Sequence, residues 1–260
     1  MSEALAIGEV KDGIGRLTLN DPARLNALSM DMVEQALAAL DRIEAETRVL
    51  VVTGAGKGFC SGANLAGGSG AGEDDVDGGA SLISHFNPFI RRMRQSKVPI
   101  ITAVRGAAAG FGASLAMSGD LIVASENAFF LQAFRNVGLV PDGGSASFLV
   151  RSIGRARAAE LMLLGERLPA AKALDWGLIT RVVPDAELEA TVDALARNLA
   201  GGPTIALGRI RQMAWSAAES DFDAELAIEV DNQRECVKSA DHKEGVAAFL
   251  EKRAPVFTGK

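Results

Sequence analysis

The sequence predicts an α/β fold that ends in a helical portion, and three observations point to this class. Short apolar runs with strand character alternate with helical patterns ahead of Pro169. From Pro169 onward, helical patterns dominate. Glycine accounts for 28 of the 260 residues, about 11% against a usual ~7%, and it gathers where predicted strands end.

Two strands and a helix are predicted at the start of the chain. Residues 4–10 and 14–20 are strand-like runs, and the Asp-Gly pair at 12–13 suits a tight hairpin turn between them. Ser29 is expected to cap a helix with apolar residues three or four positions apart, namely Met32, Val33, Ala36, Leu37, Leu40 and Ile43. The β-branched run at 49–53 then predicts a buried strand.

The middle of the chain continues the alternation of helices and strands. A helix is expected over 81–97, and Pro99 precedes a second buried strand at 100–104. A glycine-rich turn then enters an alanine-rich helix near Phe111, followed by a third strand at 121–124. The remaining expected elements are apolar pieces at 129–131 and 137–140, a helix at 145–164 with a break near Gly154, and helices at 185–199, 203–218, 223–239 and 242–253.

Residues 66–80 form a low-complexity segment rich in Gly, Ser and Asp, without an apolar face. This composition predicts an irregular loop. The loop could serve as a lid over a binding site or as a plain surface linker, and the sequence leaves both alternatives open.

Composition excludes several classes of protein. The net charge is -6, from 27 basic and 33 acidic residues, which argues against a broad nucleic-acid-binding face. No apolar stretch approaches the ~18 residues of a membrane span, and the N-terminus lacks the pattern of a signal peptide. Two cysteines are too few for a disulfide framework, so we expect a cytoplasmic protein with reduced thiols. Two histidines argue against a multi-histidine metal site, and no metal is expected.

The glycine-rich loop after the 49–53 strand resembles a nucleotide-binding loop but departs from both common patterns. Gly54 and Gly56 fit the dinucleotide fingerprint, whereas its third glycine position holds Phe59. Lys57 is followed by Gly58 instead of the Ser or Thr of a phosphate-binding loop. Nucleotide chemistry is therefore disfavoured.

Two strand ends, near residues 53 and 104, each lead into a glycine-rich turn. Turns of this kind let backbone N–H groups approach a ligand closely, and two converging N–H groups would form an oxyanion hole. The alternative is that the glycines serve tight strand–helix packing and bind no ligand.

Cysteine and histidine offer little evidence of nucleophilic catalysis. A reactive thiol at Cys60 would need a neighbouring base, and neither His85 nor His242 lies in a recognisable motif. We expect no nucleophilic role for Cys60, an ordinary helical position for Cys236, and an exposed helical position for His85.

Five segments together resemble the crotonase superfamily, also called the enoyl-CoA hydratase/isomerase family. They are ARLNAL at 23–28, GFCSGANL at 58–65, AVRGAAAGFG at 103–112, GLVPDGG at 138–144 and KEGVAAFLEKR at 243–253. Each segment alone is a weak signal, but their order and spacing are specific, and together they extend the resemblance over essentially the whole chain.

The resemblance implies an α/β fold in which a crotonase-like spiral of ββα units occupies residues 1–200. A helical C-terminal trimerisation region would occupy 201–260. It also implies an acyl-CoA substrate and a homotrimer or dimer of trimers. Because CoA belongs to the substrate, no separate cofactor is expected. The two oxyanion-hole amides of the family map onto the backbone N–H groups of Ser61 and Phe111.

The resemblance also assigns residues to substrate binding. The matching positions are Arg24, Leu25, Ala63, Asn64, Leu65, Phe249 and Lys252. The family usually has Asp where Asn64 stands, and Gly where Phe111 stands. The tail positions Phe249 and Lys252 would reach CoA within the chain or from a neighbouring subunit, although Lys252 also fits a solvated helical charge.

The type of reaction is indicated by which of the family's catalytic carboxylates this chain has and which it lacks. The two glutamates that activate water in family hydratases fall at Ser114 and Phe134, so hydration is disfavoured. Asp142 matches the proton-shuttling residue of the double-bond isomerases, and an apolar pocket containing Phe134 and Leu139 would make it a better base. Asp142 could alternatively be a plain turn former.

The sequence therefore favours a Δ3–Δ2-type enoyl-CoA isomerase, or a related isomerase of ring products from aromatic acids. The alternatives left open are an enoyl-CoA hydratase, a hydrolase or decarboxylase of the same family, and a non-catalytic acyl-CoA binder.

Overall fold

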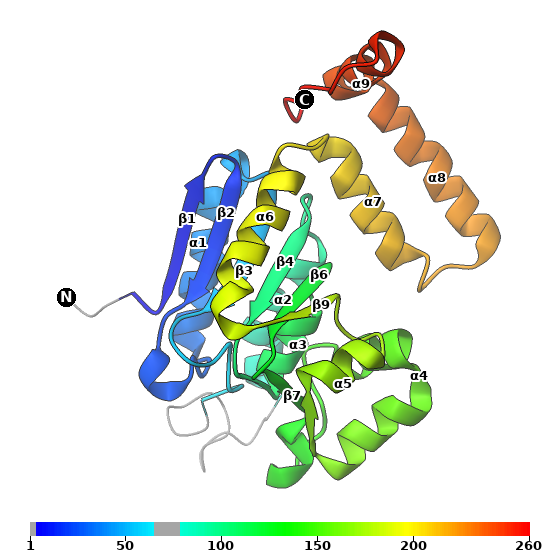
Figure 1. Ribbon diagram of the computed structural model, residues 1–260. Coiled ribbons are helices and arrows are strands. Elements are labelled where there is room, and N and C mark those ends of the chain that lie inside the picture. The colour runs from blue at the N-terminus through cyan, green and yellow to red at the C-terminus, as the bar shows by residue number, and fades with distance from the viewer. Residues whose placement is uncertain (1–3, 65–78) are drawn as a thin grey trace.

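The computed structural model describes residues 4–64 and 79–260, and a six-stranded sheet forms its centre (Figure 1). The sheet order is β1 (Ala6–Lys11), β2 (Ile14–Leu19), β3 (Val49–Gly54), β4 (Ile100–Val104), β6 (Leu121–Ser125) and β9 (Arg181–Val183). Strands β1 and β2 form the predicted antiparallel hairpin, and the other neighbours pair in parallel. The carboxyl ends of β2, β3, β4, β6 and β9 therefore lie along one edge of the sheet.

A second, three-stranded sheet has the order β5 (Ala107–Ala109), β7 (Phe129–Leu131) and β8 (Arg167–Pro169). Strand β5 was not predicted, because three alanines have little intrinsic strand preference; it forms by pairing in parallel with the aromatic β7. The apolar piece at 137–140 is not a strand. The 3-10 helix η4 (Ala133–Val137) ends there at Gly138, whose φ of 73° is left-handed.

The predicted helices are present with shifted boundaries. Helix α1 (Met30–Ile43) has the expected cap, since the Ser29 side chain accepts from the Met32 N–H. The helix expected at 81–97 consists of a π-helical turn, η3 (Leu82–Phe86), and α2 (Asn87–Arg94). The others are α3 (Phe111–Met117), α4 (Ser145–Leu164, kinked at Gly154), α5 (Ala170–Asp175), α6 (Leu188–Ala200), α7 (Thr204–Ser216), α8 (Phe222–Val237) and α9 (Ala240–Glu251), with 3-10 turns η1 (Pro22–Arg24), η2 (Glu44–Glu46) and η5 (Asp185–Glu187).

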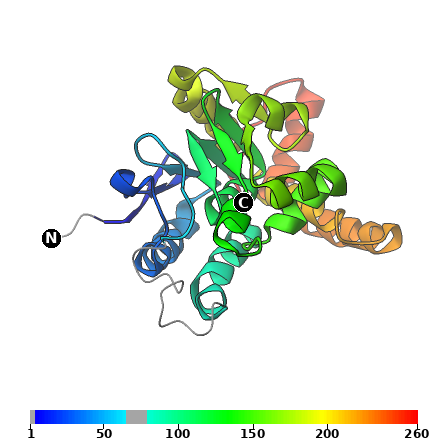
Figure 2. The same cartoon turned by 90° about the horizontal axis from the view of Figure 1, so that it is seen from below.

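Helices cover both faces of the large sheet, and the side chains of β3 show how. Leu50 and Val52 belong to the larger core with α1, α2 and α3, whereas Val49 and Val51 pack on the other face with residues of α6 such as Val192. Alternation along a strand with both faces buried explains the continuous apolar run in the sequence. Figures 1 and 2 show α6 and α1 on opposite sides of the sheet.

Helices α7, α8 and α9 extend away from the sheet (Figure 1). A buried ion pair attaches α7 to the body of the protein: Arg211 Nε lies 2.7 Å from an Asp120 carboxylate oxygen. The same guanidinium donates to the carbonyls of Met93, Arg94 and Ser96 at the end of α2. Because each buried charge has partners, this contact holds α7 in a defined orientation.

Within residues 4–64 and 79–260, no helix is long and apolar enough to cross a membrane. In the same ranges, no group of three His, Cys, Asp or Glu side chains is placed to hold a metal ion. All but the last two residues of the predicted 66–80 loop lie outside the described part of the chain.

Candidate active site

The two glycine-rich segments predicted to form a site lie side by side at the carboxyl ends of β3 and β4. The Cys60 N–H donates to the Ala107 carbonyl and the Ala109 N–H donates to the Cys60 carbonyl, each at 2.9 Å. This edge of a parallel sheet is where ligands commonly bind, because the loops that leave the strands converge there.

The two segments touch at a pair of glycines with left-handed backbone. The φ angles are 103° at Gly62 and 52° at Gly110. A Cβ placed on Gly62 would lie 3.0 Å from the Ala109 carbonyl oxygen and 3.7 Å from the Gly110 Cα. The residues that directly follow these glycines, Ala63 and Phe111, therefore start from adjoining backbone.

Ser61 is an oxyanion donor in the assignment that the family resemblance implies, but its N–H and its hydroxyl already have hydrogen-bond acceptors within the chain. Its N–H donates to the Leu25 carbonyl at 3.0 Å, and its hydroxyl donates to the Arg24 carbonyl at 3.1 Å. The Ser61 amide thus holds the 24–25 loop against the first glycine-rich segment. This geometry contradicts its assignment as an oxyanion donor.

The Ala63 amide is the candidate donor in the first segment whose N–H has no acceptor among the described residues. Ala63 forms a parallel bridge with Leu28, in which the Leu28 N–H donates to the Gly62 carbonyl and the Asn64 N–H to the Leu28 carbonyl. In this pattern the N–H of Ala63 itself points away from Leu28. Among the described residues it has no acceptor, so it is available to a ligand.

The Phe111 amide is a second candidate donor. Phe111 is the first residue of α3, and N–H groups in a first helical turn have no acceptor within the helix. The part of the chain described here offers the Phe111 N–H no other acceptor. The Phe111 ring is buried and packs against Phe86 with ring centroids 4.9 Å apart, which fixes the residue firmly.

Asn26 holds the site together, and sequence reasoning named it only as part of a motif. Its buried side-chain amide donates to the carbonyls of Ala55, Gly58 and Phe59, and its side-chain oxygen accepts from the Asp21 N–H. These contacts join the 21–26 loop to the first glycine-rich segment. The available signal was a polar residue between apolar neighbours in ARLNAL.

Asp142 lies in a turn that continues through Gly143 and Gly144, whose φ angles of 58° and 77° are both left-handed. One carboxylate oxygen, Oδ1, is buried and has no hydrogen-bond partner among the described residues. Burial raises the pKa of Asp142 to about 6. A partly dehydrated carboxylate with this pKa suits a general base near neutral pH.

The Asp142 turn rests on the first turn of α3. A Cβ placed on Gly143 would lie 2.8 Å from the Ser114 Cβ and 3.0 Å from the Phe111 ring, so only glycine permits this approach. Phe134 is buried on the same side, with its Cζ 3.9 Å from a Cβ placed on Gly110. The structure thus brings together Phe111, Phe134 and Asp142, as the resemblance implied.

Other predicted site residues are at the surface of the single chain. Leu139 is 54% exposed, so it faces solvent and does not enclose Asp142 as predicted. Leu25 is exposed beside Ser61, and the Arg24 guanidinium forms an exposed ion pair with Asp21 at 3.1 Å. Arg24 and Leu25 flank the first glycine-rich segment and are free to contact a ligand from outside.

The C-terminal candidates are not near this site in the single chain. Phe249 and Lys252 lie at the end of α9, which Figure 1 shows far from α3 and β7. Phe249 is 82% exposed. Leu65 lies outside the described residues.

The Cys60 thiol and the His85 imidazole show no sign of a catalytic role in the structure. Cys60 is buried, and burial raises the pKa of its thiol to about 12, which is unfavourable for a nucleophile. His85 is half-buried, not exposed as predicted: Nε2 lies 3.0 Å from Glu34 Oε1 and Nδ1 lies 2.7 Å from the Ser84 hydroxyl.

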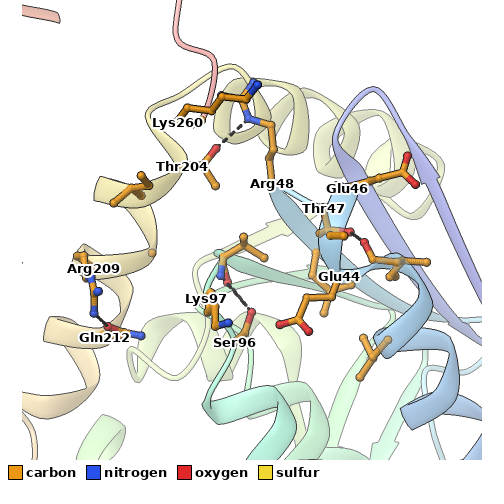
Figure 3. Close-up of a pocket in the computed structure, with 18 of the residues that line it drawn as sticks. Glu44, Glu46, Thr47, Arg48, Ser96, Lys97, Thr204, Arg209, Gln212 and Lys260 are labelled. Atoms are coloured by element: carbon orange, nitrogen blue, oxygen red, sulfur yellow. Dashed lines mark hydrogen bonds between the residues drawn. The ribbon is translucent and has the colours of Figure 1, made fainter. Parts of the chain in front are cut away.

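A cleft of about 910 Å³ opens elsewhere, between the C-terminal end of α1 and helix α7 (Figure 3). Its walls carry charges of both signs, with Glu44 on one side of the opening and Arg209 on the other. Arg48, just before β3, spans part of it and donates to the Thr204 hydroxyl at 2.8 Å. The cleft lies at the amino end of β3 and contains none of the predicted site residues.

Comparison with known proteins gives a consistent result. The family described as enoyl-CoA hydratase/isomerase matches residues 9–260. The chain is 44% identical to the 1,2-epoxyphenylacetyl-CoA isomerase of Escherichia coli K12, over 98% of both chains. It is 40% identical to a probable enoyl-CoA hydratase of Rhodobacter capsulatus, over 97% of both. The crystal structure of a putative enoyl-CoA hydratase/isomerase from Mycobacterium abscessus superposes with a TM-score of 0.92 at 32% identity, covering 98% of this chain and 100% of that one, which confirms the predicted fold class.

Proposed function

The chain belongs to the enoyl-CoA hydratase/isomerase family, and we propose that it is an acyl-CoA isomerase that moves a double bond with one carboxylate base. The observation that carries this proposal is Asp142, whose buried carboxylate oxygen has no hydrogen-bond partner among the described residues and whose turn packs, through Gly143, on the Phe111 ring. In this proposal the thioester oxygen binds the N–H groups of Ala63 and Phe111.

The proposed reaction needs no water and no second carboxylate. Asp142 removes a proton from carbon 2 of a 3-enoyl-CoA, and the electron pair moves to the thioester oxygen to give a dienolate. The two amides stabilise the oxygen's negative charge by hydrogen bonds that strengthen as the charge develops. The protonated Asp142 then returns the proton to carbon 4, and the double bond forms between carbons 2 and 3.

Hydration receives no comparable support. Water addition requires a group that deprotonates water and a group that protonates carbon. At the two positions where hydratases of the family carry glutamates, this chain has Ser114 and Phe134. Phe134 cannot transfer a proton, and the Ser114 hydroxyl already donates to the Asp142 carbonyl at 2.9 Å.

The test is conversion of trans-3-hexenoyl-CoA to the 2-enoyl isomer, followed by the ultraviolet absorbance of the conjugated thioester. We expect turnover by the wild type, and a loss of about 1,000-fold or more in kcat for Asp142→Asn, since removing a catalytic base costs at least its 10²–10⁴-fold contribution. CoA binding, measured by calorimetry, should be unchanged. Full turnover by Asp142→Asn would exclude this base, and rapid hydration of crotonyl-CoA by the wild type would favour a hydratase.

A second candidate substrate is 1,2-epoxyphenylacetyl-CoA, because the E. coli relative is named as its isomerase and is 44% identical over 98% of both chains. This would be a ring-product isomerase of the kind the sequence analysis left open. Incubating the wild type with each thioester in turn, with product analysis by mass-coupled chromatography, distinguishes the two. A kcat/KM at least 100-fold higher for the epoxide would make it the assigned substrate.

We further propose that the chain assembles as a homotrimer or a dimer of trimers. Exposed apolar side chains on α8 and α9 support this, namely Phe222, Leu226, Val230, Val246, Phe249 and Leu250. In such an assembly, Phe249 and Lys252 would approach the acyl-CoA of a neighbouring subunit. Light scattering that gives a monomer mass at micromolar concentration would refute the assembly.

A further inference from the structure

Among the described residues, no ion pair or side-chain hydrogen bond to the Asp142 carboxylate is seen. Its buried Oδ1 accepts no hydrogen bond from the described residues. Burial raises the pKa of Asp142 to about 6. The position of this group therefore depends on whatever fixes the main chain of the 142–144 turn.

Two donors fix that main chain through the Asp142 carbonyl. The Ser114 hydroxyl donates to it at 2.9 Å and the Ser145 N–H donates to it at 3.0 Å. Ser145 belongs to the same turn, and its hydroxyl is bonded to the buried Gln132 at 2.7 Å. Ser114, in contrast, is a fully buried residue of α3, so its bond ties the turn to a separate element.

Ser114 also lies one helical turn after Phe111, three residues along α3, which corresponds to a rise of about 4.5 Å. Gly143 packs on both residues. The amide of Phe111 and the hydroxyl of Ser114 therefore belong to one rigid helical turn. Any group fixed to Ser114 has a defined distance from the Phe111 amide.

We propose that Ser114 is a positioning residue: its hydroxyl fixes the Asp142 turn on α3 and thereby sets the distance between the Asp142 carboxylate and the oxyanion donor at Phe111. The inference rests on the proposed function for its catalytic consequence. Ser114 transfers no proton to substrate in this arrangement, because its single hydroxyl proton is donated to a carbonyl. Its role is geometric, at a position where hydratases of the family use a carboxylate chemically.

The experiment compares Ser114→Ala with Ser118→Ala. Ser118 is the matched control, since it is also fully buried, directly follows α3, and donates its hydroxyl to a backbone carbonyl, that of Leu115, at 2.7 Å. For Ser114→Ala we expect kcat for the 3-enoyl-CoA to fall by about 10- to 100-fold with KM within about 3-fold, since a shift of ~1 Å in a reacting group can cost 10²-fold. Ser118→Ala should retain kcat within about 3-fold, and the two variants should lose similar thermal stability.

A second readout does not depend on activity. The Asp142 carboxyl of ligand-free protein is followed by carbon-13 NMR during a pH titration, with Asp142→Asn used to assign the signal. Releasing the turn admits water, so in Ser114→Ala the pKa of Asp142 should fall by about one unit toward its ordinary value of 3.8. Ser118→Ala should titrate like the wild type.

The outcomes separate the inference from the proposed function. A wild type inactive on 3-enoyl-CoA refutes the proposed double-bond isomerase activity, while the NMR titrations still decide the positioning role. Wild-type kcat and titration in Ser114→Ala, or equal losses in both variants, would overturn the positioning role. If Ser114→Ala does not fold, Ser114→Cys is interpreted in the same way, because a thiol is only a weak donor.

Discussion

Replacing Asp142 by Asn should make the protein more stable at pH 8 while removing its proposed catalysis. Burial raises the pKa of Asp142 to about 6 from an ordinary 3.8. Between these two values the folded protein holds a proton that the unfolded chain has released. Stability therefore falls as pH rises through this window, and the cost of the buried charge is fully present above about pH 7.

The magnitude follows from the shift. Roughly two units at 1.36 kcal/mol each give about 3 kcal/mol as an upper limit. Asp142 is only partly buried, so solvent screening reduces the expected value to about 1–2 kcal/mol. Asn carries no charge at any pH, so the variant should gain this full amount at pH 8 and only a minor part of it at pH 4.5, close to the unfolded pKa of 3.8.

The assay is urea unfolding of wild type and Asp142→Asn at pH 8, 6 and 4.5, at one fixed protein concentration so that any assembly affects both equally. The quantity to compare is the difference in unfolding free energy between the two proteins at each pH. Any effect of the Asn side chain that does not depend on pH adds the same amount at each pH. It therefore does not affect how the difference in unfolding free energy changes with pH. The matched control is Asp185→Asn, because hydrogen bonds from Ser125 and Arg105 lower the pKa of Asp185, so its loss should destabilise at pH 8.

A stability difference that does not vary between pH 4.5 and 8 would refute the raised pKa. A difference that grows in the wrong direction, with the variant less stable at pH 8 than at pH 4.5, would show that the carboxylate is stabilised in its charged form. The activity profile offers an independent check. With a base of pKa about 6, kcat/KM of the wild type should be half-maximal near pH 6 and fall by about tenfold per unit below it.

Three further predictions test the architecture of the site. Gly143→Ala should lower kcat by about 10-fold or more with little change in KM, since the added Cβ would lie 2.8 Å from the Ser114 Cβ and displace the Asp142 turn; initial-rate kinetics measure this, and unchanged kcat would contradict it. Asn26→Asp should destabilise the fold by about 2–4 kcal/mol in urea unfolding, because three carbonyls, two of them buried, lose their donor and face a carboxylate; a loss below about 0.5 kcal/mol would contradict the role of Asn26 in joining the two loops. Arg211→Met should cost about 3–5 kcal/mol by leaving Asp120 without its buried cation; equal stability at pH 7 would show that Asp120 is neutral in the fold.

The fold was largely predictable because its elements are coded locally. The Asp12-Gly13 hairpin, the Ser29 cap and the β-branched run at 49–53 each carry their own signal, and each is present in the structure. Strand β5 carries no such signal. Its three alanines become a strand through pairing with β7 and the bridge to Cys60, which are contacts between residues distant in sequence.

The sequence predicts where the candidate site lies, but not which backbone N–H groups are left without an acceptor. The glycine clusters mark both segments, and Asp142 follows from its motif. Which amide of the first segment is free depends on pairing register. The Leu28–Ala63 bridge turns the Ala63 N–H outward, whereas the carbonyl of Leu25, a residue with a φ of 51°, takes up the Ser61 N–H. Neither the register nor a left-handed leucine can be inferred from residue types, which is why the sequence alone does not show that the Ser61 N–H already has an acceptor.

The two residues that replace the hydratase carboxylates contact different parts of the site. Ser114 bonds the carbonyl of Asp142 and so holds its backbone, and Phe134 places a buried ring against the glycine that precedes the Phe111 donor. A carboxylate at position 114 would lie near Asp142, and like charges held close in a dehydrated site cannot all ionise. The same two substitutions remove the carboxylates by which hydratases activate water, whereas the proposed proton shuttle needs only the Asp142 carboxylate.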